Sequence, residues 1–303
     1  MTIASNFVED HVLVQSAQKF KEDIESETDG RFSVEISPGG AYGSASEITE
    51  LTRDGGVDGS VQGTAPFDQY TPGYFFFQNP FVPKDYDHIL RIMDHDLFQP
   101  AYEKLRSEGN QRQVGNVIYR GTRQTVTKEG WGPIRSVDDL EGLQPRITPW
   151  ETWQRTWRAT GVDPVAIDWP EVYTALETGT ADAAEAPPES LRSASIYEVV
   201  DYLSQTDNLT TVGSMFVREE FYQGLDETYQ DLVDELALSA SEYGTEMAME
   251  EEQTHYDFFE EQGIEIVPRE EIDRGSIVDA AASAIEELFA ERWESDYETI
   301  QSI

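Results

Sequence analysis

The chain of 303 residues contains no cysteine, and this absence excludes disulfides, thiolate catalysis and zinc sites built on sulfur. Positive charge is also scarce: 21 Lys and Arg stand against 60 Asp and Glu, so the formal net charge is −39. Nucleic acid and anionic lipid surfaces would be repelled by such a protein. Neither is therefore expected as a partner.

Long hydrophobic runs are missing as well. No apolar stretch reaches the roughly 20 residues that a transmembrane helix needs. The first residues, Met1 to Phe7, lack the charged and apolar regions of a signal peptide. The sequence as given is therefore expected to be soluble.

The chain does contain enough apolar side chains for a folded core, with 38% hydrophobic and 11% aromatic residues. This content favours a packed core under a solvated acidic surface over a disordered acidic chain. Few of the basic residues are lysine, and together with the excess of carboxylates this indicates a halophilic source. At molar salt the Debye length is only about 3 Å, so an anionic ligand can still approach such a surface.

The apolar pattern alternates between strand and helix periods. It predicts strands near Met1 to Phe7 and Phe32 to Ile36, and helices over about Val12 to Thr28 and Ser44 to Asp54. Ser44 and Glu47 form a capping-box pattern, and Gly55 is placed to end the second helix. This βαβα rhythm predicts an α/β fold, and the chain length favours two lobes or one large domain.

One arginine is placed to bind an anion. The run Leu140 to Ile147 reads as a short helix end, a glycine turn and a strand, which would present Arg146 where the strand meets a loop. A guanidinium held there offers two parallel N–H donors to a carboxylate. The alternative is a structural salt bridge, since acidic partners are plentiful.

The order of the motifs resembles the solute-binding receptors of tripartite ATP-independent periplasmic (TRAP) transporters, the DctP-like family. The resemblance extends over nearly the whole chain, and its most specific part is the run Glu171-Val172-Tyr173-Thr174-Ala175-Leu176. Other parts are Phe20 to Arg31, Gly43 to Leu51 and Ile134 to Leu143. In this family a similar strand arginine binds the carboxylate of the ligand.

The resemblance implies a two-lobed, periplasmic-binding-protein-like α/β fold with a hinge and a ligand cleft between the lobes. Lobe I would comprise residues 1–121 plus 211–248, and lobe II residues 122–210 plus 249–303. A long helix from about Glu227 to Gly263 would run along both lobes, and Gly244 could bend it.

The resemblance also suggests further ligand contacts. Arg123 stands where the family often has a second cationic contact, its alternative being a hinge salt bridge. Trp169 precedes the most specific motif and could pack on the ligand's carbon skeleton or in the core. Tyr173, inside that motif, is a further ligand-binding candidate. Ala186 replaces an asparagine that donates to the ligand in the family, which leaves the usual ligand set in doubt.

Three other places are candidates with open alternatives. Glu185 could bind ligand hydroxyls or a cation, or serve the structure. Trp150 begins a stripe with Trp153 and Trp157 that is typical of a core, but it follows Arg146 closely enough to line the cleft. Gln62 and Thr64 lie in a glycine-containing turn after a predicted strand, where open α/β sheets bind ligands, although an ordinary loop fits equally well.

These observations predict an extracytoplasmic receptor that captures an organic acid and delivers it to a separate TRAP permease. The resemblance further implies a monomer and an export or lipid-anchor segment removed from this sequence. We expect no cofactor and no metal site, because the four histidines show no common metal spacing. A carboxylate-dependent hydrolase and a receptor serving a sensor are the alternatives. No GxSxG, HExxH or phosphate-loop motif supports catalysis. Trp169 and Ala186 favour a sugar acid or an aromatic acid over a small dicarboxylate.

Overall fold

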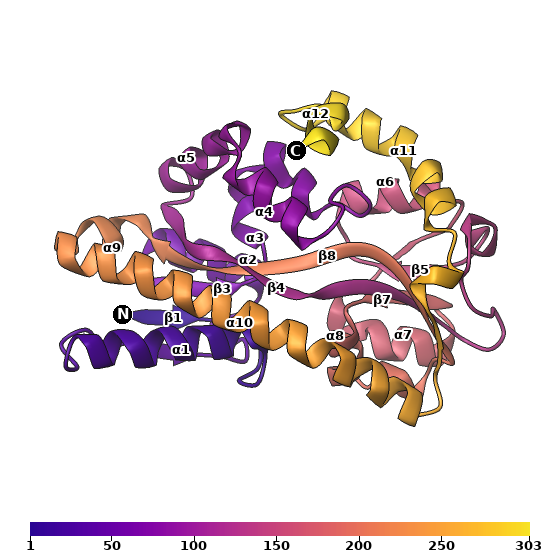
Figure 1. Cartoon of the computed structure of the whole chain (residues 1–303), viewed down its shortest axis with the longest axis horizontal. Helices are drawn as coiled ribbons and strands as arrows, with labels where there is room; N and C mark the ends of the chain where they lie inside the picture. The colour runs from indigo at the N-terminus through magenta and orange to yellow at the C-terminus, as the bar shows by residue number, and fades with distance from the viewer. The chain divides into compact units, whose positions relative to one another are not determined.

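The computed structural model describes residues 1–303, which divide into two compact units. Unit 1 comprises Met1–Phe75, Leu90–Arg120 and Val212–Met249. Unit 2 comprises Phe76–Ile89, Gly121–Thr211 and Glu250–Ile303. Five elements contribute residues to both units: η1 (Pro72–Gln78), α4 (Tyr86–Asp94), β4 (Gln111–Thr127), β8 (Tyr202–Arg218) and α10 (Glu227–Glu261) (Figure 1).

Unit 1 is built on a short parallel sheet. Its central strand β1 (Thr2–Ala4) pairs in parallel with β2 (Glu35–Ser37) on one side and with β3 (Gly59–Gln62) on the other. β3 then pairs antiparallel with β8. The helices of this unit are α1 (Val12–Glu27), α2 (Ala45–Asp54), α3 (Ala65–Tyr70), α5 (Gln99–Ser107) and α9 (Glu219–Gln223).

The ends of α2 follow directly from the local sequence. Ser44 Oγ accepts from the Glu47 N–H, and the Glu47 carboxylate accepts from the Ser44 N–H, so the expected capping box is confirmed. Gly55 ends the helix in the left-handed conformation at φ 82°, as predicted, because this conformation costs glycine little. Local chemistry thus sets both limits of this helix.

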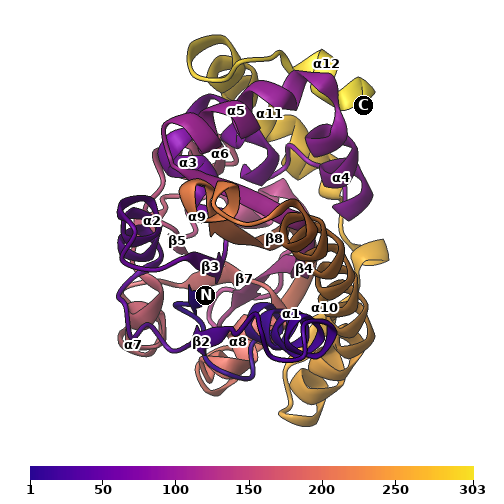
Figure 2. The same ribbon diagram turned by 90° about the vertical axis from the view of Figure 1, so that its left-hand side faces the viewer.

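Helix α10 packs closely on α1 and β4 in unit 1 (Figures 1 and 2). Two glycines permit this approach: a Cβ at Gly115 would overlap the Ala237 carbonyl, and one at Gly244 would overlap Ser16 Oγ. The helix is continuous from Glu227 to Glu261. Gly244, which the sequence suggested as a bend, therefore serves as a packing site.

Replacing Gly244 by alanine should lower the free energy of unfolding by about 1–3 kcal/mol, because α1 or α10 must shift to admit the methyl group. Chemical denaturation at constant salt would measure this change. Gly130→Ala is the matched control, since a Cβ at Gly130 meets nothing within 4 Å. Equal stability of the two variants would contradict this packing role.

Unit 2 repeats the strand pattern of unit 1. Its central strand β5 (Pro145–Ile147) pairs in parallel with β6 (Val165–Ala166) and β7 (Ala183–Ala186), and β7 pairs antiparallel with β4. β9 (Glu265–Val267) pairs in parallel with β8. The helices of this unit are α6 (Glu151–Ala159), α7 (Val172–Thr178), α8 (Pro188–Ser193), α11 (Arg274–Glu291) and α12 (Tyr297–Ser302).

The segment Phe76–Ile89 belongs to unit 2, whereas the sequence placed it in the first lobe. Its contacts explain this: the Phe76 ring centroid lies 5.5 Å from that of Phe289, and His88 Nε2 lies 2.9 Å from the Ile300 carbonyl oxygen. The segment is thus tied to the end of the chain. No helix of the protein combines the length and apolar character needed to cross a bilayer.

Candidate functional site

Arg146 lies on the central strand of unit 2 and is almost completely buried, with 2% of its surface exposed. Its Nε donates to the Ile167 carbonyl at 2.7 Å, which fixes the plane of the guanidinium. The guanidinium carbon lies 5.4 Å from the centre of the Trp169 ring. Nη1 and Nη2 form no hydrogen bond with the protein, and no carboxylate oxygen lies within 4.0 Å of them.

Burial makes the charged form of Arg146 less stable than that of an exposed arginine. Burial lowers the pKa of Arg146 to about 10; the carboxylates of Glu185 and Asp168 oppose this shift, and the charge of Arg123 adds to it. The guanidinium is therefore still protonated at pH 7. A buried charge without a counterion costs free energy, and in a protein with 60 acidic residues this cost could readily have been offset by a carboxylate.

Arg123, on β4, is already paired. Its guanidinium forms a buried bidentate ion pair with Glu185 on β7, and its Nη2 also donates to the Glu185 carbonyl at 2.7 Å. The two side chains meet because Thr125 pairs with Glu185 where β4 runs beside β7. Nη1 of Arg123 forms no hydrogen bond and stays available to a ligand.

One tryptophan ring lies beside each of the two arginines. The guanidinium carbon of Arg123 lies 5.0 Å from the centre of the Trp153 ring, and Trp153 Nε1 donates to the Gln78 carbonyl at 2.8 Å. Trp150 stands edge-on to Trp153, with ring centroids 5.0 Å apart. Trp169 is half-buried, packs against the core of unit 2 and contacts Arg146. Trp169 thus lies beside Arg146, whereas Trp150 contacts Trp153, the ring beside Arg123.

Sequence reasoning placed Trp153 only in a core stripe and missed its contact with Arg123. The contact joins residues thirty positions apart, which meet because the end of β4 from Gly121 onward and α6 both belong to unit 2. Nothing in the spacing of the tryptophans could reveal it.

Gln62 and Thr64 lie in unit 1 at the carboxyl end of β3. The Gln62 amide is fully buried and donates to Ser60 Oγ and Thr49 Oγ1, at 2.9 and 3.1 Å. Thr64 precedes α3, and its carbonyl accepts from Phe67 at 3.0 Å. Both hydrogen bonds of the Gln62 amide nitrogen are made within unit 1, whereas its Oε1 accepts no hydrogen bond.

Neither Tyr173 nor Ala186 forms a hydrogen bond with Arg146. The Tyr173 hydroxyl donates to Glu198 at 3.0 Å, and no hydrogen bond or ring contact joins Tyr173 to Arg146. Ala186 is buried at the end of β7 beside Gln124. An alanine side chain has no hydrogen-bond donor, so Ala186 cannot donate to a ligand as an asparagine could.

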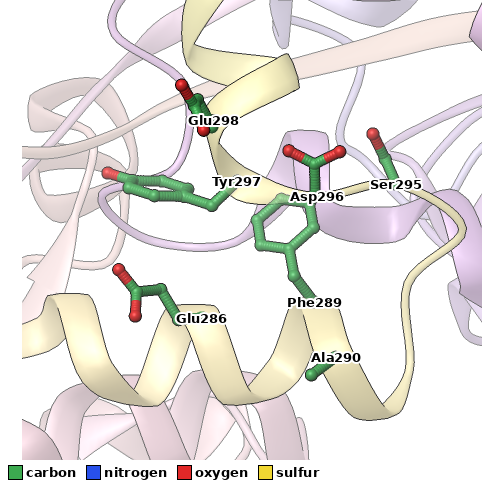
Figure 3. Close-up of a pocket in the computed structure, with 7 residues that line it drawn as sticks. All are labelled: Glu286, Phe289, Ala290, Ser295, Asp296, Tyr297 and Glu298. Carbon is green, nitrogen blue, oxygen red and sulfur yellow. The ribbon is translucent and has the colours of Figure 1, made fainter.

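No group of three or more His, Cys, Asp or Glu side chains is arranged to hold a metal ion. A separate open cavity of about 340 Å³ lies between α11 and α12 (Figure 3). The residues lining it are Glu286, Phe289, Ala290, Ser295, Asp296, Tyr297 and Glu298. None of them was predicted as a site residue, and none contacts the two arginines.

Arg146 is thus a buried cation on a short parallel strand, beside the Trp169 ring and without a carboxylate in direct contact. Residues 3–292 match the family model of bacterial extracellular solute-binding proteins, family 7, or DctP. The chain belongs to this family, which is the TRAP receptor family that the sequence resembled.

Two curated relatives illustrate the family. The solute-binding protein RD1_1052 of Roseobacter denitrificans is 26% identical over 89% of this chain and 81% of its own length. The 2,3-diketo-L-gulonate-binding periplasmic protein of Escherichia coli is 25% identical over 90% of this chain and 82% of its own length. Both relatives are named for binding a solute.

A solved structure shares the fold. A TRAP periplasmic solute-binding protein from Pseudomonas putida, with bound D-glucuronate, superposes with a TM-score of 0.86 at 23% identity, covering 100% of this chain and 97% of that one. This likeness confirms the predicted fold class, an α/β fold of the two-lobed binding-protein type.

Proposed function

We propose that this protein is an extracytoplasmic receptor that captures an organic acid anion with Arg146 and delivers it to a TRAP membrane permease. The two free nitrogens of Arg146 bind the carboxylate of the ligand, and Arg123 Nη1 adds a further donor. Closure of the two lobes then excludes water and strengthens these charged contacts. The receptor acts as a monomer outside the cytoplasmic membrane.

The observation that carries this proposal is that Arg146 has no direct ion pair. The protein has 60 acidic residues, and it pairs the neighbouring Arg123 with Glu185, yet no carboxylate contacts the buried guanidinium of Arg146. An anionic ligand would supply the missing charge. Glu185 holds Arg123 in place in this scheme and is not itself a ligand-binding group.

The ligands of related proteins and the tryptophan rings near the arginines both suggest which class of acid this protein binds. The E. coli relative is named for 2,3-diketo-L-gulonate, and the P. putida structure holds D-glucuronate. Both are acids of sugars, and Trp169 offers a flat apolar surface to a sugar ring. We therefore propose a sugar acid as the ligand class.

A thermal-shift comparison of D-glucuronate with D-glucose tests this proposal. The two sugars differ at C6, where a carboxylate replaces a hydroxymethyl group, and a ligand that binds only the folded state raises the melting temperature. We expect a rise with D-glucuronate or another sugar acid and none with the neutral sugar. Equal responses to both sugars would contradict a carboxylate receptor. Turnover of a glycoside would instead favour the hydrolase.

The acidic surface also gives a prediction about salt, which rests on the proposed halophilic origin. With a net charge of −39, self-repulsion should destabilise the protein at low ionic strength, and screening should restore its stability. The melting temperature should therefore rise by several degrees between 0.1 and 2 M NaCl. A melting temperature that falls or stays constant over this range would argue against adaptation to salt.

A further inference from the structure

The open cavity between α11 and α12 has no role in the proposed function. Its volume of about 340 Å³ lies within the range of small-molecule sites, which is about 300–1,000 Å³. All of its lining residues belong to the segment Glu250–Ile303 of unit 2, so the cavity is complete within one unit. The cavity is therefore large enough for a ligand of its own.

Two aromatic rings form the apolar wall of this cavity. The ring centroids of Phe289 and Tyr297 lie 5.8 Å apart, and the ring planes are inclined by 47°. Figure 3 shows the Phe289 ring pointing from α11 toward α12, beside Tyr297. Phe289 also packs against the rings of Phe76 and Trp293, with centroids 5.5 and 4.8 Å away. These contacts hold the wall in place independently of a ligand.

Three carboxylates complete the lining, namely Glu286 on α11 and Asp296 and Glu298 at the start of α12. Asp296 caps α12, because its carboxylate accepts from the N–H and the hydroxyl of Thr299, both at 2.8 Å. The side chains of Glu286 and Glu298 form no hydrogen bond and no ion pair, and none of the lining residues is basic. The cavity thus presents two unpaired carboxylates beside two rings.

Tyr297 keeps a neutral ring close to the Glu286 carboxylate. Burial raises the pKa of Tyr297; the charge of Arg274 opposes this shift, and the carboxylates of Glu286 and Asp279 add to it. Arg274 does not line the cavity, and its Nε and Nη2 donate to the Asp207 carbonyl at 3.2 and 3.1 Å. The phenol is therefore un-ionised at pH 7, with an acidic side chain nearby.

Acidity alone does not distinguish this place, because the protein has 60 acidic residues. The rings do distinguish it: the face of an aromatic ring attracts a cation, and quaternary ammonium groups bind between such rings. A metal ion gains nothing from the ring wall, and no group of three or more His, Cys, Asp or Glu side chains is arranged to hold one. An organic cation uses both the rings and the carboxylates.

We propose that this cavity binds a small organic cation of the quaternary ammonium class. Its charge lies near the carboxylates of Glu286 and Glu298, and its alkyl groups contact the rings of Tyr297 and Phe289. The ligand has the opposite charge to the acid held by Arg146. The inference goes beyond the proposed function, and the two sites can be tested separately.

An NMR titration of the protein with choline, at constant ionic strength, tests the proposal. Dimethylbutanol is the neutral comparison, because a carbon atom replaces the ammonium nitrogen and the shape is kept. We expect saturable binding of choline and binding of the alcohol that is weaker by about tenfold or more. Equal affinities would mean an apolar cavity that does not select cations, and no saturation up to about 50 mM choline would mean that there is no site. Either result overturns the proposal.

Three variants locate the bound choline. Glu286 is exposed and unpaired, so Glu286→Gln should keep the fold and weaken choline binding by about threefold or more. Tyr297→Leu removes one ring and should weaken binding to a similar extent, whereas Tyr297→Phe keeps the ring and should bind like the unaltered protein. Unchanged affinity of both Glu286→Gln and Tyr297→Leu would place the choline elsewhere and overturn the proposal.

Glu270→Gln is the matched control. Glu270 lies in η6 (Arg269–Glu271), is exposed, forms no ion pair and does not line the cavity, so the variant removes the same charge from unit 2. Its choline affinity should be unchanged. A loss equal to that of Glu286→Gln would mean that choline responds only to net charge, which contradicts a site. Arg146→Ala should also leave choline binding unchanged, so failure of this site and failure of the clamp are distinguishable.

Discussion

Arg146→Ala should lose about 2–4 kcal/mol of ligand-binding free energy, roughly a 30- to 700-fold rise in Kd, because the bound carboxylate would be left unpaired in a buried site. Titration calorimetry with the best acid of the thermal-shift screen would measure this loss. The fold should be retained, since removing a buried cation that lacks a counterion relieves a desolvation cost.

Arg146→Lys separates charge from geometry. Lysine keeps the positive charge but cannot present two parallel N–H groups, and it cannot reproduce the Nε hydrogen bond to Ile167. We expect this variant to recover only part of the lost affinity. Full recovery would mean that Arg146 acts as a simple charge, and unchanged affinity of Arg146→Ala would remove it from the binding site.

Breaking the Arg123–Glu185 pair should have the largest effect on stability. Glu185→Ala leaves Arg123 buried without its bidentate partner and should lower the free energy of unfolding by about 3–5 kcal/mol. It also places two unpaired guanidinium groups near one another, since the charge of Arg123 already disfavours the charged form of Arg146. Urea denaturation at constant high salt would measure the change.

The double variant Arg123→Met with Glu185→Leu is the control for this prediction. Replacing both charges by apolar side chains of similar size removes the desolvation cost together with the attraction, so most of the stability should return. If Glu185→Ala alone leaves the stability unchanged, the ion pair does not hold these two strands together.

Those parts of the fold that depend on neighbouring residues could be predicted from the sequence. The capping box at Ser44 and the end of α2 at Gly55 need only a few consecutive residues, and the structure confirms both. The position of Arg146 on a short strand after a glycine turn could likewise be predicted from a few consecutive residues. The family resemblance supplied the two-lobed fold, which periodicity alone does not determine.

Partners far apart in the sequence could not be predicted. Arg123 could have paired with any of 60 acidic residues, and only the alignment of β4 with β7 selects Glu185. The sequence shows no internal repeat, yet both units place a central strand between two parallel neighbours, because strand pairing uses backbone groups and leaves side chains free to differ. The contact of Arg120 with Phe7 and His11 was missed for the same reason.

A crystal structure of the complex with the acid selected by thermal shift would test the central claim most directly. We expect the two carboxylate oxygens of the ligand to accept from Nη1 and Nη2 of Arg146 at about 2.7–2.9 Å, while Nε keeps its bond to Ile167. A bound acid whose carboxylate lies elsewhere, with Arg146 contacting only protein atoms, would contradict the account.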